Sequence, residues 1–203
     1  MLYFAYGSNL NARAVGEWCR HHDERPLRLQ GGRPAVLDNY RLGFSVFSEY
    51  WGGGMADIVY GPGKYVMGVL FDLNDAELDL LDRKVGRELD PAGREVGIYA
   101  RTEVKVAPLG KGAPVKAITY QGVSIDRNDI PPTRHYMDSV IQGACANGLS
   151  SMWVSYLQSF DTQEGRKPRP PVKEEVTRRR RAVAPSEVSG VADVAGMCEF
   201  PVA

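Results

Sequence analysis

The sequence predicts an α+β fold, because strand-like runs and segments of helical spacing occur in the same chain. Its opening run, Leu2–Ala5, is brief, aromatic and aliphatic, and it ends in turn residues, which is typical of a buried strand. Three further runs have strand character: residues 35–46, 99–107 and 115–123. Apolar residues at helical spacing predict two helices that cover the sheet: residues 134–145 and 150–160.

Two more helices are predicted between the strands. Residues 12–22 have a short helical pattern that begins soon after the first strand. Asn74 is a favourable N-cap residue, and acidic residues follow it in the first turn, which predicts a helix over residues 74–82.

Glycine and turn-forming residues interrupt the strand region. Residues 61–63, Gly-Pro-Gly, predict a tight turn into a strand over residues 64–73. Asp38 and Asn39 predict another turn, because both tolerate turn conformations. The three glycines at 52–54 cost backbone entropy, so they indicate either a close approach that side chains would block or a flexible hairpin tip.

Composition and charge indicate how large a core the chain can form and which partners and cofactors are expected. The chain has 203 residues with 43% hydrophobic content, which is enough for one core. Its 25 Lys and Arg residues equal its 25 Asp and Glu residues, so the net charge favours neither nucleic acid nor an acidic membrane. We expect a cytoplasmic protein, because no export signal and no run of about eighteen apolar residues is present. The three Cys and three His residues lack the spacing of ligand sets, so no metal or cofactor is expected.

The domain organisation follows from a change in composition near residue 160. We expect one domain over residues 1–160 and a C-terminal extension over residues 161–203. Since the extension is rich in Pro and Arg, we expect it to be extended or partly disordered. Four consecutive arginines at 178–181 do not favour nucleic-acid binding, because acidic residues dilute the run and no stacking aromatic residues interleave with it. The oligomeric state is left open.

The segment directly after the first strand has the chemistry of an anion site. Gly7 can take a positive φ and lets another group approach the backbone. Ser8, Asn9 and Asn11 can each cap the helix that follows. Amide N–H groups at a helix start bind carboxylate or phosphate oxygens, because unsatisfied donors and the positive end of the helix dipole point the same way. An ordinary strand–turn–helix connection is the structural alternative.

These residues carry a family resemblance. Tyr6-Gly7-Ser8-Asn9-Leu10 resembles the signature loop of the γ-glutamyl cyclotransferase superfamily, and we call residues 6–10 the signature loop. The resemblance continues in order through further segments: residues 36–44, 61–63, 66–71, 80–83, 99–106, 132–136, 143–144 and 147–149. It implies a small mixed β-barrel-like sheet packed with a few helices. It also implies a small-molecule ligand, a γ-glutamyl group or another carboxylate, bound by these residues: Tyr6, Gly7, Ser8, Asn9 and Leu10.

Tyr120 is a further candidate for the substrate-binding site. It stands where members of the family often place an aromatic residue that faces the pocket. Since tyrosine also favours strands, a core residue is the alternative interpretation.

The resemblance breaks at the acid–base position. Members that catalyse cyclotransfer carry Leu-Asp-x-x-Glu-Gly, whereas this chain has Leu-Asp-Arg-Lys-Val-Gly at residues 81–86. Val85 therefore occupies the carboxylate position, and a valine neither takes nor gives a proton. Glu88 and Glu95 follow in a charged segment and are the candidate catalytic substitutes, with surface charges as the alternative interpretation.

The resemblance implies a reaction in which the substrate supplies its own nucleophile. The α-amino group of a γ-glutamyl amine or peptide attacks the γ-carbonyl carbon, releasing 5-oxoproline and a free amine. Three interpretations remain open. The protein is a cyclotransferase in which Glu88 or Glu95 replaces the lost carboxylate, or a catalytically inactive module that binds a small ligand, or an active enzyme in which Val85 is an introduced substitution.

Overall fold

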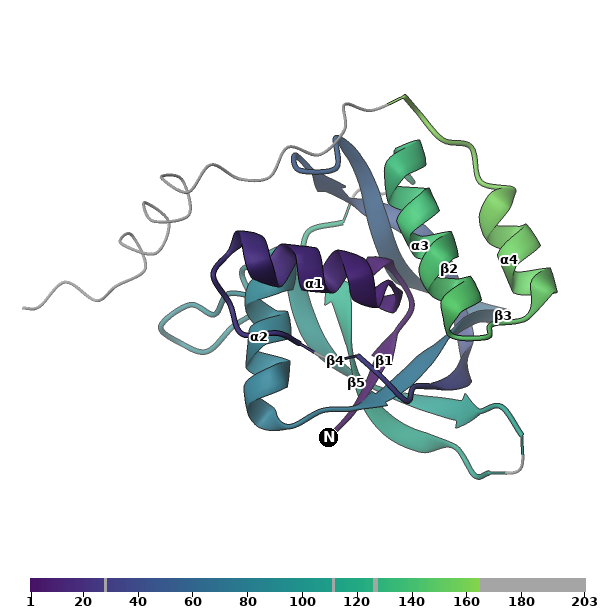
Figure 1. Ribbon diagram of the computed structural model, residues 1–203, viewed down its shortest axis with the longest axis horizontal. Helices are drawn as coiled ribbons and strands as arrows, with labels where there is room; N and C mark the ends of the chain where they lie inside the picture. The colour runs from purple at the N-terminus through teal and green to yellow at the C-terminus, as the bar shows by residue number, and fades with distance from the viewer. Residues whose placement is uncertain (28, 111, 126–127, 165–203) are drawn as a thin grey trace, which may run out of the picture. The chain divides into compact units, whose positions relative to one another are not determined.

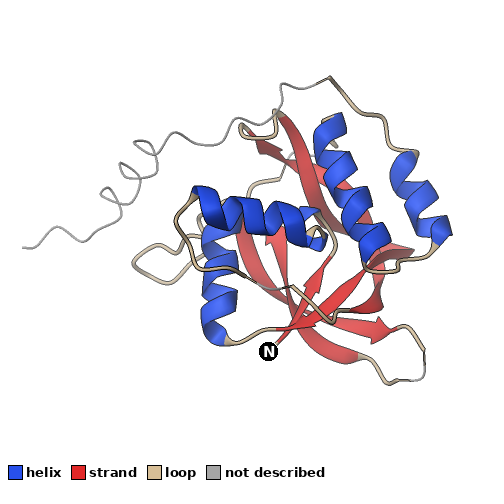
Figure 2. Cartoon of the chain, viewed as in Figure 1, coloured by secondary structure: helices blue, strands red, loops and turns tan. Residues whose placement is uncertain are grey.

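The computed structural model describes residues 1–164 apart from residues 28, 111 and 126–127. In this part of the chain, five strands form a closed barrel in the order β1-β3-β2-β4-β5 (Figures 1 and 2). The strands have these bounds: β1 Leu2–Ala5, β2 Arg33–Ser48, β3 Gly53–Asp72, β4 Tyr99–Pro108 and β5 Val115–Gly122. The helices are η1 Ser8–Leu10, α1 Ala12–His21, α2 Asp75–Val85, α3 Arg134–Ala146 and α4 Ser151–Gln158.

The pairing of the strands confirms a mixed barrel-like sheet. β1 pairs antiparallel with β3, and β2 pairs antiparallel with both β3 and β4. β4 and β5 form a further antiparallel pair. The barrel closes where β1 meets β5 in parallel, with Tyr3 opposite Ile118. Closure therefore brings β1 next to β5, which lies far from it in the sequence.

The two turns predicted from residues 38–39 and 61–63 are wrong, because both segments lie within long paired strands. Asp38 pairs with Tyr65 and Tyr40 pairs with Tyr60, so residues 61–64 lie opposite Asn39 alone. Asn39 has a φ of 63°, and its side-chain oxygen accepts a hydrogen bond from the Gly63 amide at 3.2 Å. The segment is therefore a bulge, which absorbs the extra residues without ending either strand.

The three glycines at 52–54 have two different roles. Gly52 has a φ of 70° and open space around it, as expected for the tip of the β2–β3 hairpin. Gly54 is inside β3, where a Cβ atom would lie 2.2 Å from the carbonyl oxygen of Ile130 and 2.8 Å from that of Phe44. Of the two interpretations, close backbone approach therefore holds for Gly54 and a hairpin tip for Gly52.

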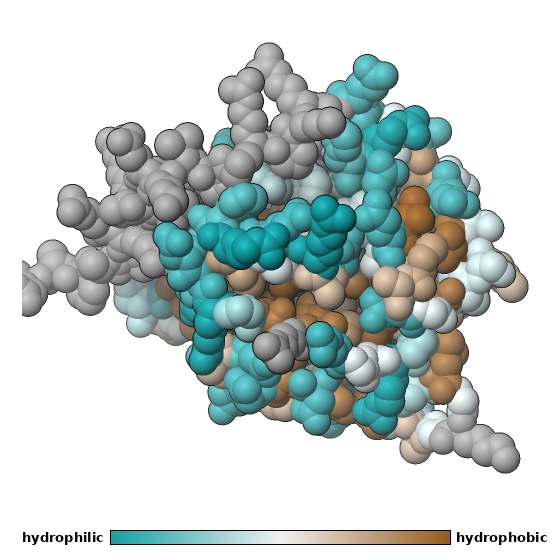
Figure 3. Space-filling model, viewed as in Figure 1, coloured by the Kyte–Doolittle hydropathy of each residue, from teal (hydrophilic) through white to brown (hydrophobic). Residues whose placement is uncertain are grey.

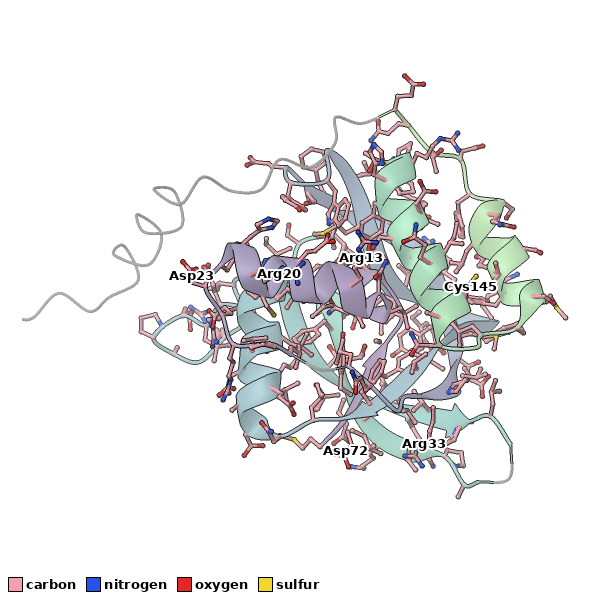
Figure 4. The ribbon with its side chains drawn as sticks, viewed as in Figure 1. Arg13, Arg20, Asp23, Arg33, Asp72 and Cys145 are labelled. Atoms are coloured by element: carbon pink, nitrogen blue, oxygen red, sulfur yellow. The ribbon has the colours of Figure 1, made fainter. Side chains whose placement is uncertain are left out.

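The predicted helices are confirmed and pack on the barrel. α1 turns Val15 and Cys19 inward, and hydrophilic side chains cover its outer face in Figure 3. Arg13 and Arg20 come from this helix in Figure 4. α3 and α4 contact each other and lie side by side (Figure 1). Together with the barrel interior, these helices bury a single cluster of apolar residues.

α2 ends at Val85, the position where the resemblance implies an acid–base residue. A capping box at Asn74 starts it: the Asn74 side chain accepts from the Glu77 amide, and the Glu77 side chain accepts from the Asn74 amide. It ends at Gly86, which takes the left-handed conformation with a φ of 71°. The helix thus runs three residues beyond the predicted end at 82.

The predicted C-terminal extension lies outside the described residues, except for residues 161–164. Cys19 and Cys145 are both free thiols; Cys19 is buried, whereas Cys145 is exposed on α3 (Figure 4). Within the described part of the chain, no helix has both the length and the apolar character that crossing a membrane requires.

Candidate functional site

The signature loop leaves β1 and forms a single 3₁₀ turn before α1. Leu10 donates its amide to the Gly7 carbonyl at 3.0 Å, and Asn11 donates its amide to the Ser8 carbonyl at 3.1 Å. Asn11, not Ser8 or Asn9, is the N-cap residue of α1. Among the described residues, none accepts a hydrogen bond from the amide of Gly7 or Asn9. The row of free donors is thus shorter than predicted, since the Leu10 amide is already used.

Gly7 fits a position with no room for a side chain. A Cβ atom there would lie 3.1 Å from the Ala56 Cβ and 3.2 Å from the Tyr136 hydroxyl. The Tyr136 hydroxyl accepts a 2.8 Å hydrogen bond from the Ala56 amide. Burial raises the pKa of Tyr136 to about 12, although hydrogen bonds from Ala56 and Ser8 partly oppose this rise. A neutral phenol therefore stands against the loop at all physiological pH values.

α3 holds the other side of the loop. The Asn147 side chain, at the C-cap of α3, donates to the Leu10 carbonyl at 2.9 Å. The Asn11 side chain donates to the Ser139 carbonyl at 3.2 Å. Gly143 lies so close that a Cβ atom would be 2.5 Å from the Leu10 carbonyl carbon. The loop is thus fixed from both sides, as a preorganised binding site requires.

Tyr6 and Tyr120 are both buried in the apolar core. The Tyr6 hydroxyl donates to the Tyr120 carbonyl at 2.5 Å, and the Tyr120 ring packs edge-on against Tyr3 with 5.8 Å between ring centroids. Tyr120 is only 3% exposed, and its hydroxyl donates to the Asp82 carboxylate at 2.7 Å. Burial, and then the hydrogen bond to Asp82, raise the pKa of Tyr120. Tyr120 therefore links β5 to α2.

Asp82 is the centre of a cluster of charges at the end of α2. Arg87 donates to its Oδ2 at 2.9 Å, and Arg101 reaches both oxygens at 2.8 and 2.7 Å. Arg87 also pairs with Glu95 at 2.8 Å. The cluster joins β4, β5, α2 and the segment after α2 through one carboxylate.

Glu88 and Glu95, the two candidates for the acid–base role that the resemblance implies, have different surroundings. Glu88 is exposed, and its backbone carbonyl accepts from the amides of Val96 and Gly97. Glu95 is partly buried and held by Arg87, while its Oε2 has no hydrogen-bond donor among the described residues. No hydrogen bond in the described part of the chain joins either side chain to the signature loop. Their catalytic role stays a prediction.

Val85 is partly buried and packs against the core as the last residue of α2. It offers a hydrocarbon surface where the resemblance implies a proton carrier. Gly86 then turns the chain, and a Cβ atom at this position would lie 2.9 Å from the Ile98 side chain. The end of α2 is therefore tightly defined.

Lys84 is the site residue that the sequence interpretation missed. Its Nζ donates a 2.7 Å hydrogen bond to the Asn9 side-chain oxygen, and the Asn9 amide nitrogen donates to the Tyr3 hydroxyl at 2.9 Å. Burial lowers the pKa of Lys84 to about 8, with the nearby Cys19 acting weakly in the opposite direction. The spacing of residues on α2 could have indicated that Lys84 points inward. Lys84 lies four residues after Leu80 and three after Leu81, which are both buried, so it shares their helix face.

No group of three or more potential metal ligands occurs among the residues that the structure describes. The polar groups around the loop are instead amides, tyrosine hydroxyls and one lysine amine. Such groups suit the binding of a carboxylate or an amide carbonyl.

Comparisons with known proteins agree with this fold. Residues 65–158 match the AIG2-like family. The chain is 30% identical to γ-glutamylcyclotransferase of Bos taurus and 29% identical to that of Mus musculus, in each case over 167 residues that cover 80% of both proteins. A solved structure of a γ-glutamyl cyclotransferase superposes with a TM-score of 0.63 at 27% identity, covering 90% of this chain and 98% of the other.

The match to the curated relatives extends over most of both chains, and the barrel agrees with the solved structure. The chain belongs to the γ-glutamylcyclotransferase family.

Proposed function

We propose that the protein binds the γ-glutamyl end of a small amine or peptide at the signature loop and converts it to 5-oxoproline and a free amine. The observation that carries the proposal is the pair of unused amides at Gly7 and Asn9, held in a loop that β3 and α3 fix in place. These donors suit the substrate's α-carboxylate or the oxyanion that develops on its γ-carbonyl.

The proposed reaction requires no nucleophile from the protein, because the substrate's own α-amino group attacks. The flexible γ-glutamyl chain has to fold so that its nitrogen meets its own carbonyl carbon, and positioning of this kind lowers the barrier by several kcal/mol. A proton must also leave the α-ammonium group before it can attack. General acid–base catalysis contributes roughly a hundredfold to ten-thousandfold.

Val85 favours a second candidate function. Without a carboxylate at this position, the same loop can hold a γ-glutamyl compound or another small carboxylate without turning it over. On this alternative the protein is a binding module that has kept the fold of the enzyme. A cytoplasmic location and a C-terminal extension beyond residue 160 remain our proposals from the sequence.

The test combines turnover with binding. The full chain is incubated with a panel of γ-glutamyl amines and peptides while 5-oxoproline and free amine are measured, and binding is followed by calorimetry. Release of both products supports the enzyme, whereas binding without release supports the module. If no member of the panel binds, the proposal fails.

A matched pair of glycine variants tests whether the ligand binds at the signature loop. Gly7→Ala forces a methyl group against Ala56 and Tyr136, so it is expected to weaken binding. Gly16→Ala adds the same methyl group on α1, where the nearest atom is a flexible arginine nitrogen at 3.7 Å, and is expected to leave binding unchanged. Equal affinity of the two variants would show that the ligand does not bind at the signature loop.

A further inference from the structure

We propose that Lys84 is the proton carrier of this site, taking over the role that Val85 cannot perform. Its amine accepts a proton from the substrate's α-ammonium group and returns it to the leaving amine. This inference rests on the proposed cyclotransferase function.

The position of the amine supports the role. Lys84 directly precedes Val85 on α2, and its longer side chain reaches the signature loop, where Nζ lies 2.7 Å from the Asn9 oxygen. Asn9 belongs to the same short turn as the unused amides, and its side chain is in turn held by the Tyr3 hydroxyl. The amine is thus fixed beside the proposed binding loop, in a chain of hydrogen bonds that includes the Tyr3 hydroxyl of β1.

The charges around Lys84 support the role as well. Three neighbouring arginines all have carboxylate partners: Arg83 pairs with Glu24, Arg87 with Asp82 and Glu95, and Arg101 with Asp79 and Asp82. Among the described residues, no carboxylate forms an ion pair with Lys84. The groups that face its amine are the neutral Asn9 side chain from the loop and the Cys19 thiol from α1.

An amine in such surroundings is suited to move a proton near neutral pH. Burial without a counter-charge disfavours the ammonium form and lowers the pKa of Lys84 to about 8. Lysines tuned to this range by burial are effective general bases, because the neutral form is then populated at working pH. A carboxylate-paired arginine has no such neutral form.

The nearby carboxylates are less suited to the role. Asp82 is occupied by Arg87, Arg101 and the Tyr120 hydroxyl. Glu95 is held by Arg87, and Glu88 is exposed. The Asp82 oxygens are thus already used by three donors within the protein.

In the proposed reaction, Lys84 both receives the proton from the substrate and returns it to the leaving group. The neutral amine takes one proton from the α-ammonium, whose freed electron pair attacks the γ-carbonyl carbon and forms the ring C–N bond. The tetrahedral intermediate then loses its original amide nitrogen, and the Lys84 ammonium gives its proton to that nitrogen. Attack leaves the ring nitrogen with two protons, and the neutral Lys84 amine passes the second of these to the departing amine as well. The amine leaves as an ammonium group, 5-oxoproline remains, and Lys84 is neutral again.

The experiment compares Lys84→Met and Lys84→Arg with the unaltered full chain. Both variants should lose roughly a hundredfold or more in kcat, the usual scale for an acid–base group. Lys84→Arg should still bind γ-glutamyl substrates, because it keeps the positive charge, and thermal melting would show that both variants fold. In the unaltered protein kcat should rise with pH through about 8, and this rise should be absent from any residual rate of the variants.

Arg83→Met is the matched control, because Arg83 lies next to Lys84 in sequence but pairs with Glu24 outside the site; its kcat should be unchanged. Full turnover by Lys84→Met overturns the inference and leaves the cyclotransferase function standing. Full turnover by Lys84→Arg also overturns it, since the side chain would then act by its charge alone. Binding without 5-oxoproline release at any pH overturns it too, while a complete lack of binding rejects the proposed function itself.

Discussion

The Tyr120 hydroxyl donates a 2.7 Å hydrogen bond to the Asp82 carboxylate, which joins β5 to α2. Arg87 and Arg101 complete the surroundings of Asp82. The same helix end carries Lys84 and Val85, so the cluster that anchors Asp82 also fixes the residues proposed to face the ligand. We therefore expect substitutions in this cluster to affect both stability and the proposed function.

Asp82→Asn should destabilise the fold. The carboxylate side chain is only 13% exposed, and its loss leaves Arg87 and Arg101 without their shared counter-charge. Breaking a buried pair from one side costs about 3 kcal/mol, which urea unfolding would measure. Asp79→Asn is the control, because Asp79 has a 64% exposed side chain and pairs with Arg101 alone; its cost should stay below about 1 kcal/mol. Equal costs for the two variants would contradict the central role of Asp82.

Val85→Glu should raise 5-oxoproline release when it is combined with Lys84→Met, which removes the proposed proton carrier. It restores a carboxylate at the end of α2, where the resemblance implies the acid–base residue, and a gain of roughly a hundredfold is the usual scale for such a group. Val85→Gln has nearly the same shape but cannot carry a proton, so it serves as the control. Comparable rates for the Glu and Gln variants would show that the site has diverged in more than one residue.

Gly54→Ala should be far more damaging than Gly52→Ala. A methyl group at Gly54 meets two backbone carbonyl oxygens, which cannot move like a side chain, so we expect a loss of about 3 kcal/mol or more. Gly52 has open space around it, and only its positive φ penalises alanine, by about 1 kcal/mol. Chemical denaturation of both variants would check the order, and a reversed order would refute the close approach of β3 to residue 130.

The free energy of unfolding should rise between about pH 8 and pH 10 because of Lys84. In the unfolded chain this lysine keeps its proton up to its ordinary pKa of 10.5, whereas in the folded protein it releases the proton near 8. Over this window the unfolded state binds more protons, so raising the pH favours the folded state. Lys84→Met should flatten the rise, as measured by urea unfolding at several pH values.

The measurement should stop near pH 10. Burial raises the pKa of Tyr6 and Tyr99 well above the ordinary value of 10.0, so above that pH the unfolded tyrosines lose protons that the folded ones keep. Stability then falls for a reason unrelated to Lys84. An identical pH profile for the unaltered protein and Lys84→Met below pH 10 would show that the amine is not desolvated.

The local elements could be read from the sequence with small errors. Asn74, with Glu77 three residues later, defines the start of α2 because the capping interaction is formed by neighbours along the chain. The strands β1, β4 and β5 were recognisable by their apolar pattern. The bulge at Asn39 was not, since the Gly-Pro-Gly segment that predicts a turn lies between two paired residues of β3, whose partners in β2 are more than twenty positions earlier.

By itself, the sequence determined the family, the fold class and the presence of a valine at position 85, because each of these depends on which residues follow one another. Only the tertiary structure decided which groups surround the signature loop. Lys84 and Asn9 are 75 positions apart, and the amide of Leu10 is used while those of Gly7 and Asn9 are not. Barrel closure and the packing of α2 and α3 create these neighbours, and contacts of that range leave no pattern in the local sequence.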